Sequence, residues 1–375
     1  MSTRTYSVGG VSWKIVVVAV IGVLAALVPQ FIGAFWTSVA ITIIAIALFA
    51  MSFNLLFGYT GLLSFGHQAF SGLAAYAVAV TLAGSTNIGV IPEFDSFLVA
   101  VGAAIVVAIV ASALIGALCV QRGGIFFAML TLALSMLLYE TAFTWQDLTG
   151  GANGTTLVPP EVSLGPLAFN PLNPGEYYYF VFAIFIICLF LMWRLVNSPF
   201  GETLIAIREN AERAEFVGIN VKLYQWASFI ISGAFAGVAG ALLSVQAFNV
   251  APGVLHWSTG AEAVVATLIG GPTTFLGPVL GAGVFIMLEE VLTGFISDGW
   301  QVVLGALLVP IVLFFPKGIL GTLLGGQSGG TMLRDSLSLG SGEAPGPGAE
   351  STGDDAATAG EVPGADGAPP TEEDD

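Results

Sequence analysis

The side chains that could interact with a polar solute are concentrated in a glycine-rich segment that begins at residue 54. Asn54, Ser64, His67 and Gln68 supply hydrogen-bond donors and acceptors there, within a chain that is otherwise strongly apolar. Polar groups inside a membrane are costly and usually face a cavity or a neighbouring helix. We therefore predict that these four residues lie along a path for a polar solute, where they replace its water.

The alternative is that these polar groups only join neighbouring helices. Hydrogen bonds between membrane helices contribute about 0.6 to 2 kcal/mol each. For His67 we favour this interpretation, because a single histidine without an acidic neighbour in sequence does not indicate a proton relay. No catalytic role is expected for any of the four residues.

Motifs for nucleotide hydrolysis and for zinc catalysis are missing from the sequence. A phosphate-binding GxxxxGK[ST] loop requires a Gly-Lys dipeptide, and the chain has none; it also has no HExxH motif. The two cysteines, Cys119 and Cys188, lie in apolar stretches without metal-ligand spacing, and we interpret them as packing residues. The chain is therefore expected to be no enzyme and to bind no cofactor or metal.

The composition identifies the surroundings in which these residues lie. Of 375 residues, 56% are hydrophobic and only 9% are charged, with a mean hydropathy of +0.90. Ordinary soluble domains have about 25% charged residues, so a soluble globule is excluded. The net charge of -16 argues against nucleic-acid binding, which requires a basic face.

Apolar segments long enough for membrane helices recur along the chain. A bilayer core of about 30 Å requires about 20 apolar residues of helix. We predict an all-α, polytopic transmembrane bundle of ten spans, with eight or nine as alternatives. The predicted segments are 15–36, 37–57, 62–83, 97–119, 124–143, 178–196, 223–247, 261–271, 276–293 and 300–316. Residues 58–61 and 270–278 are predicted to break re-entrant helices, since irregular backbone at membrane depth needs protein or water around it.

The distribution of charge predicts the orientation. With ten spans and a cytoplasmic N-terminus, all nine lysines and arginines fall on one side, as expected for cytoplasmic loops. We expect a multi-pass protein of the cell (plasma) membrane with both termini in the cytoplasm. Residues 1–334 form the transmembrane domain, whereas 335–375, with 11 acidic and no basic residues, is predicted to be a disordered cytoplasmic tail.

The most charged part of the transmembrane domain is the loop 197–222. Ser198 and Pro199 are typical of a helix start, and Gly218 of a stop. In a single amphipathic helix, one face would hold Leu204, Ile207, Ala211, Ala214 and Gly218, and the opposite face the charged residues, Arg208 among them. Such a helix would pair Arg208 with Glu212, and Glu209 with Arg213, at about 0.2 to 0.5 kcal/mol each. This is too little to explain the helix, so we favour a coupling helix that binds a partner protein. A purely interfacial connector is the alternative.

Several blocks in a fixed order resemble one known family. They are NLLFGYTGLLSFGHQAFSGLAAY (54–76), RGGIFFAMLTLALSMLL (122–138), TGGANG (149–154), SPFGETLIAIRENAERAEFVGINV (198–221), SGAFAGVAGAL (232–242) and GGPTTFLGPVLGA (270–282). Together they make the chain, from about residue 50 to 318, similar to the M-type membrane permease of ATP-binding cassette (ABC) importers for branched-chain amino acids. The acidic tail departs from the family pattern.

The resemblance implies partners and roles. The partners would be a second homologous permease, two ATP-binding subunits and an extracellular solute-binding protein, and the solute an amino acid. Coupling to the ATPase would involve Arg208, Glu209, Ala211, Glu212, Arg213, Ala214 and Gly218. A stripe of small residues is expected to pack against other helices of this chain, in preference to the second permease. It consists of Ser232, Gly233, Ala236, Gly237, Gly240 and Ala241.

Two alternatives stay open at this point. Related permeases carry urea or short amides, so the solute is less certain than the mechanism. An ion-coupled secondary transporter would place carboxylates within its spans, whereas Glu140, Glu262, Glu289 and Glu290 fall near predicted span ends.

Overall fold

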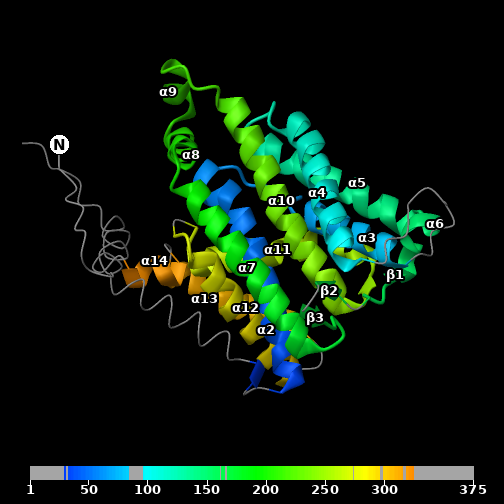
Figure 1. Ribbon diagram of the computed structural model, residues 1–375. Coiled ribbons are helices and arrows are strands. Elements are labelled where there is room, and N and C mark those ends of the chain that lie inside the picture. The colour runs from blue at the N-terminus through cyan, green and yellow to red at the C-terminus, as the bar shows by residue number, and fades with distance from the viewer. Residues whose placement is uncertain are drawn as a thin grey trace, which may run out of the picture. The chain divides into compact units, whose positions relative to one another are not determined.

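The computed structural model describes residues 29–30, 33–83, 96–160, 162–164, 167–272, 274–295, 299–315 and 318–324. Most of the predicted first span, residues 15–36, lies outside the described residues, and so does the acidic tail 335–375. Helices make up most of the described chain (Figure 1).

Six of the described helices are long and apolar enough to cross a membrane. They are α2 (Ala34–Asn54) with its continuation η1 (Leu55–Thr60), α4 (Phe97–Cys119), α5 (Ile125–Thr144), α7 (Pro174–Val196), α10 (Val221–Ala247) and α12 (Gly277–Phe295). Shorter apolar helices are α3 (Gln68–Ala83), α11 (Trp257–Gly270) and α13 (Trp300–Phe314), followed by α14 (Gly318–Leu324). The helical, polytopic class is confirmed. Each predicted span after the first corresponds to a helix, but the count of ten spans is not confirmed.

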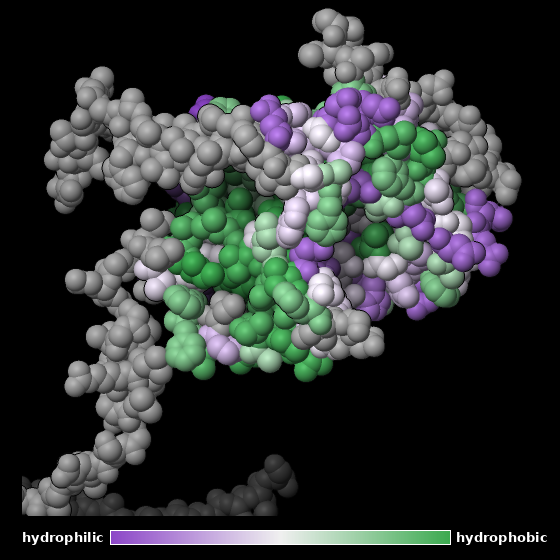
Figure 2. Space-filling model, turned by 90° about the horizontal axis from the view of Figure 1, so that it is seen from below, coloured by the Kyte–Doolittle hydropathy of each residue, from purple (hydrophilic) through white to green (hydrophobic). Residues whose placement is uncertain are grey.

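Two central helices carry the core, and the others surround them. Most of α2 and α10 is buried, whereas less than a third of α4, α5, α7 and α12 is buried. The central α10 contacts α2, α3 and α4, and α2 contacts α7, α11 and α12. The exposed side chains of the surrounding helices are themselves apolar, for example Leu114, Leu118 and Ile187. In Figure 2 hydrophobic side chains cover a broad area of the surface, which suits contact with lipid.

The small-residue stripe of α10 lets this helix approach its neighbours closely. A Cβ atom on Gly233 would overlap Ser112 of α4, one on Gly237 would overlap Ala108 of α4, and one on Gly240 would overlap the backbone of Ser71 in α3. The predicted packing within the chain is therefore confirmed. The two cysteines are buried free thiols, as their apolar surroundings in the sequence indicated.

The all-α expectation needs one correction, in the connections between helices. Strand β1 (Thr155–Thr156) pairs antiparallel with β4 (Asn249–Val250), and β2 (Val162–Leu164) pairs antiparallel with β3 (Leu167–Phe169). Short helical turns accompany them: α6 (Gln146–Thr149), η2 (Gly151–Asn153) and η3 (Pro252–Leu255). The β1–β4 pair joins two loops that are almost 100 residues apart in sequence, at the end of α10 opposite to the charged loop.

Candidate coupling and translocation site

The charged loop forms two helices rather than one. Helix α8 (Pro199–Glu209) and helix α9 (Ala211–Phe216) are separated by Asn210, whose backbone is extended, with φ -158° and ψ 98°. The Asn210 side chain accepts a hydrogen bond from the N–H of Arg213 at 2.8 Å and so caps α9. The prediction of a single helix is therefore wrong. Asn210 could have indicated the start of a second helix, since asparagine is a preferred N-cap.

This break removes the ion pairs that a continuous helix would make. Among the described residues, no salt bridge joins Arg208 to Glu212 or Glu209 to Arg213. Instead, the guanidinium of Arg208 donates a hydrogen bond to the backbone carbonyl of Gly58 in η1. The sequence placed Arg208 on the outer face of the loop helix, but its charge is directed toward the bundle.

The segment that receives Arg208 depends on a glycine with a left-handed backbone. Gly61 ends η1 with φ +77°, and a Cβ atom there would lie 3.1 Å from Cγ of Arg208. Residues other than glycine are strained in this conformation. The close approach of α8 to the end of η1 therefore requires glycine at position 61.

The two halves of the loop are held differently. In α8, the residues Gly201, Leu204 and Ile207 are buried against the bundle. In and after α9, the large apolar side chains of Phe216 and Val217 are 83% and 73% exposed. The sequence did not single out these two residues, although apolar side chains at the end of a charged segment are a readable signal.

The predicted coupling residues divide in the same way. Ala214 is buried, whereas the others in α9 and around it are exposed: Glu209, Ala211, Glu212, Arg213 and Gly218. The face expected for a continuous helix grouped Ala211 and Gly218 with the buried residues, and the break at Asn210 explains why they are exposed.

Both predicted breaks coincide with a departure from α-helix, and they lie side by side. Residues 58–60 belong to the π-helical η1, which ends at Gly61, and α11 ends at Gly270 before α12 begins at Gly277. The side-chain amide of Asn54 donates to the carbonyl of Thr274 at 3.4 Å, and a Cβ atom on Gly58 would overlap the carbonyl of Pro272. The sequence predicted the positions of both breaks, but not that they contact each other next to α8.

The four predicted pathway residues are all buried, with at most 2% of each residue exposed. His67 is enclosed by the rings of Phe49, Phe53 and Phe70. Its Nε2 lies 2.8 Å from Oγ of Ser52 in α2, and this hydroxyl donates to the carbonyl of Phe49. We therefore assign the hydrogen of a neutral imidazole to Nε2, which leaves Nδ1 as an acceptor.

Each pathway residue also retains a buried polar atom without a hydrogen-bond partner among the described residues. These atoms are Asn54 Oδ1, Ser64 Oγ, His67 Nδ1 and Gln68 Oε1. Only Tyr76 and Gln246 share this property in the part of the chain that the structure describes. An unsatisfied buried polar group costs about 1 to 3 kcal/mol, and such groups in a native protein call for an explanation. Here they are concentrated between residues 54 and 68.

Six helices that are long and apolar enough to cross a membrane, with a charged loop bonded to an interrupted helix, form the polytopic helical bundle expected of a membrane permease. The family model for the permease component of the branched-chain amino acid transport system matches residues 35–312, and the chain belongs to this family. The resemblance recognised in the sequence is thus confirmed.

Individual relatives agree with this assignment. The high-affinity branched-chain amino acid transport system permease protein LivM of Escherichia coli K12 is 24% identical over 330 residues, which cover 83% of this chain and 75% of the relative. The corresponding protein BraD of Pseudomonas aeruginosa is 25% identical over 283 residues, covering 73% and 91%. The permease protein LivH of Salmonella typhimurium is 31% identical over 125 residues, covering 33% and 40%. No solved structure matches significantly.

Proposed function

We propose that this chain is the transmembrane permease subunit of an ABC importer for branched-chain amino acids. It forms part of the translocation pathway and receives movement from ATP-hydrolysing subunits. The observation that carries the proposal is the hydrogen bond from Arg208 in the charged loop to the carbonyl of Gly58. Membership of the family and the names of its relatives favour this function over urea or amide transport and over ion-coupled transport.

This hydrogen bond gives movement of the loop a direct route to the interior. Gly58 belongs to η1, a π-helical turn that continues α2, and Asn54 lies one turn earlier. Asn54 in turn bonds to the second interruption at Thr274. A π-helical turn is a common site of local adjustment in functional helices. A displacement of α8 would therefore shift both interruptions together.

The exposed half of the loop supports an ATPase partner. Phe216 and Val217 project among the charged groups of α9, and apolar anchors surrounded by polar residues are typical of protein interfaces. A second homologous permease, two ATP-binding subunits and an extracellular solute-binding protein complete the proposed importer. The binding protein would approach the opposite end, where β1 and β4 pair.

The arrangement of the ends supports the proposed orientation in the cell membrane. Segments assigned to the cytoplasmic side meet at one end: α8 contacts η1, the carbonyl of Pro272 lies against Gly58, and Gly318 lies against Gly271. Loops assigned to the outer side pair through β1 and β4. Both termini would then be cytoplasmic.

The pathway residues support an amino acid as the solute. Asn54, His67 and Gln68 each offer an unpartnered acceptor, the type of group that an ammonium requires. All are buried here, so a path through them opens only in another conformation, as alternating access demands. In this proposal the unsatisfied acceptors are groups that the passing solute satisfies.

The partner is tested by crosslinking from single cysteines in native membranes. Ala211→Cys and Val217→Cys would be made after Cys119→Ala and Cys188→Ala, and treated with a bifunctional thiol-to-amine reagent. Both exposed positions should capture an ATP-binding subunit. Val106→Cys, exposed on the apolar surface of α4, is the matched control and should not. Failure of both loop positions would contradict the proposal.

A further inference from the structure

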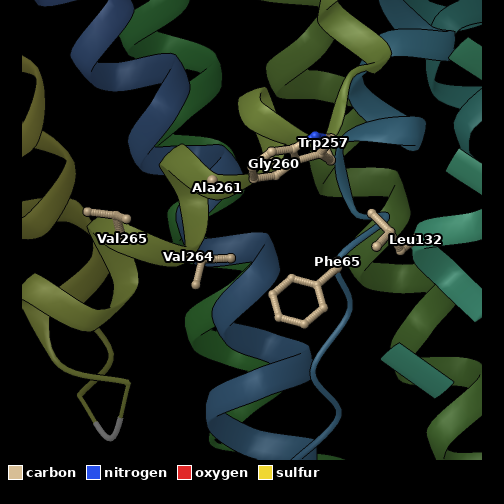
Figure 3. A pocket seen from close by; sticks show the side chains of 7 residues that line it. All are labelled: Phe65, Leu132, Trp257, Gly260, Ala261, Val264 and Val265. Carbon is tan, nitrogen blue, oxygen red and sulfur yellow. The ribbon is translucent and has the colours of Figure 1, made fainter. Parts of the chain in front are cut away.

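An apolar hollow lies beside the irregular segment that follows η1. Its volume is about 280 Å³, and its wall consists of Phe65, Leu132 of α5 and five residues of α11 between Trp257 and Val265. In Figure 3, Phe65 lies between Val264 of α11 and Leu132 of α5. Pockets for small molecules begin at about 300 Å³, so the hollow suits part of a small solute.

The position of this hollow indicates that it does not face lipid. Residues 61–67 form neither helix nor strand, and Gly61 and Phe65 are exposed. At the end of this segment His67 contacts Ser52, which precedes Thr60 by eight residues, or about 12 Å along a helix. The irregular backbone therefore crosses a substantial part of the membrane. Irregular backbone within a membrane is tolerated only where it borders protein or water, which favours such surroundings for this face over lipid.

One wall of the hollow separates it from an unpartnered acceptor. Gly260 lines the hollow, and a Cβ atom on it would overlap Oε1 of Gln68. Gln68 is fully buried, and its amide donates to Oγ of Ser135 at 3.1 Å, while Oε1 has no partner among the described residues. An apolar surface thus lies next to a free carbonyl oxygen.

We propose that this hollow receives the branched aliphatic side chain of the transported amino acid, and that the ammonium group reaches Gln68 Oε1 when α11 moves away from Gln68 during transport. The lining side chains of Phe65, Leu132, Trp257 and Val264 offer carbon surface, which accommodates an aliphatic group and penalises a polar one. Ala261 leaves space between them. This inference rests on the proposed function, because it assigns a contact surface to that same transported solute.

The test fills the hollow and measures transport by the complete complex. Ala261→Trp should reduce ATP-dependent leucine uptake by at least about tenfold, equivalent to about 1.4 kcal/mol, and alanine uptake by less. Ala117→Trp, on the exposed surface of α4, is the matched control and should leave both solutes unaffected. Equal uptake by the two variants would overturn the inference. Absence of leucine uptake by the wild-type complex would instead contradict the proposed function.

A second variant identifies the occupant and does not depend on tolerance of tryptophan. Ala261→Cys, without the two native cysteines, should react with a hydrophilic thiosulfonate reagent, and leucine supplied with the binding protein should slow the reaction. Modification only by a lipid-soluble reagent would show that lipid fills the hollow. Loss of the second permease from the purified Ala261→Trp complex would show that a protein side chain fills it. Either result overturns the inference.

Discussion

Helices α8 and α9 are neighbours in a strongly charged loop, yet they face in different directions. Helix α8 buries Leu204 and Ile207 and reaches Gly58 through Arg208, whereas α9 ends in the exposed pair Phe216 and Val217. One extended residue, Asn210, separates them. The difference shows how a short loop can have one half attached to the bundle and the other half available to a partner.

The largest expected effect belongs to the exposed half. Phe216→Asp together with Val217→Asp places charges where α9 is proposed to enter the ATPase. Truncating an interface anchor costs about 2 to 4 kcal/mol, so uptake should fall by about 100-fold and the ATP-binding subunits should be lost on purification. Ile205→Asp, on the exposed side of α8, is the matched control. Retention of the ATP-binding subunits by the double variant would contradict the division between the two helices.

A smaller effect is expected where the attached half meets η1. Gly61→Ala forces a left-handed backbone, at a cost of about 1 to 2 kcal/mol, and brings Cβ against Arg208. The detergent-solubilised protein should melt at a lower temperature, with uptake reduced several-fold. Gly33→Ala is the control, because Gly33 has an ordinary φ of -62° and nothing near its missing Cβ. Equal melting temperatures for the two variants would argue against this contact.

A still smaller effect is expected from a substitution at Asn210, the residue that joins α8 to α9. Asn210→Ala removes the cap on α9 and costs about 1 kcal/mol, which corresponds to about fivefold weaker binding of the ATP-binding subunits. Asn210→Asp keeps an acceptor for the N–H of Arg213 and should bind like the wild type. Titration of the ATP-binding subunits against the purified permease measures the difference. Identical affinities for all three forms would show that the cap does not order α9.

The smallest effect is expected for the charge pairs that a continuous helix would contain. A double-mutant cycle with Glu209→Gln and Arg213→Gln should give a coupling energy close to zero, because these side chains form no ion pair. A continuous helix would give about 0.2 to 0.5 kcal/mol. The cycle is measured on thermal stability, and a coupling energy in that range would show that the helix continues through Asn210.

The sequence predicted the parts of this molecule that depend on local pattern. Apolar runs located the helices, and glycine and proline located both interruptions, because these residues act within a few positions. The same reasoning identified the buried polar residues Asn54, Ser64, His67 and Gln68. Their unpartnered atoms could not be predicted, because hydrogen bonding depends on which helices become neighbours.

Long-range arrangement accounts for what was missed. Contact between Asn54 and Thr274 joins residues 220 positions apart, and the strands at Thr155 and Val250 are too short to leave a periodic pattern. At Asn210, charge pairing favoured continuity, but the residue is extended and its side chain caps the N–H of Arg213, so a new helix begins there. The weak preference for a continuous helix is overridden by this local cap.

The central claim is that Arg208 carries movement from the loop to the interrupted helix, and the ratio of transported amino acid to hydrolysed ATP tests it most directly. In the reconstituted complex, Arg208→Ala should retain its ATP-binding subunits and hydrolyse ATP, while transporting about tenfold less leucine per ATP. Arg208→Lys keeps a charged donor and should recover part of the ratio. An unchanged ratio in Arg208→Ala would contradict the account.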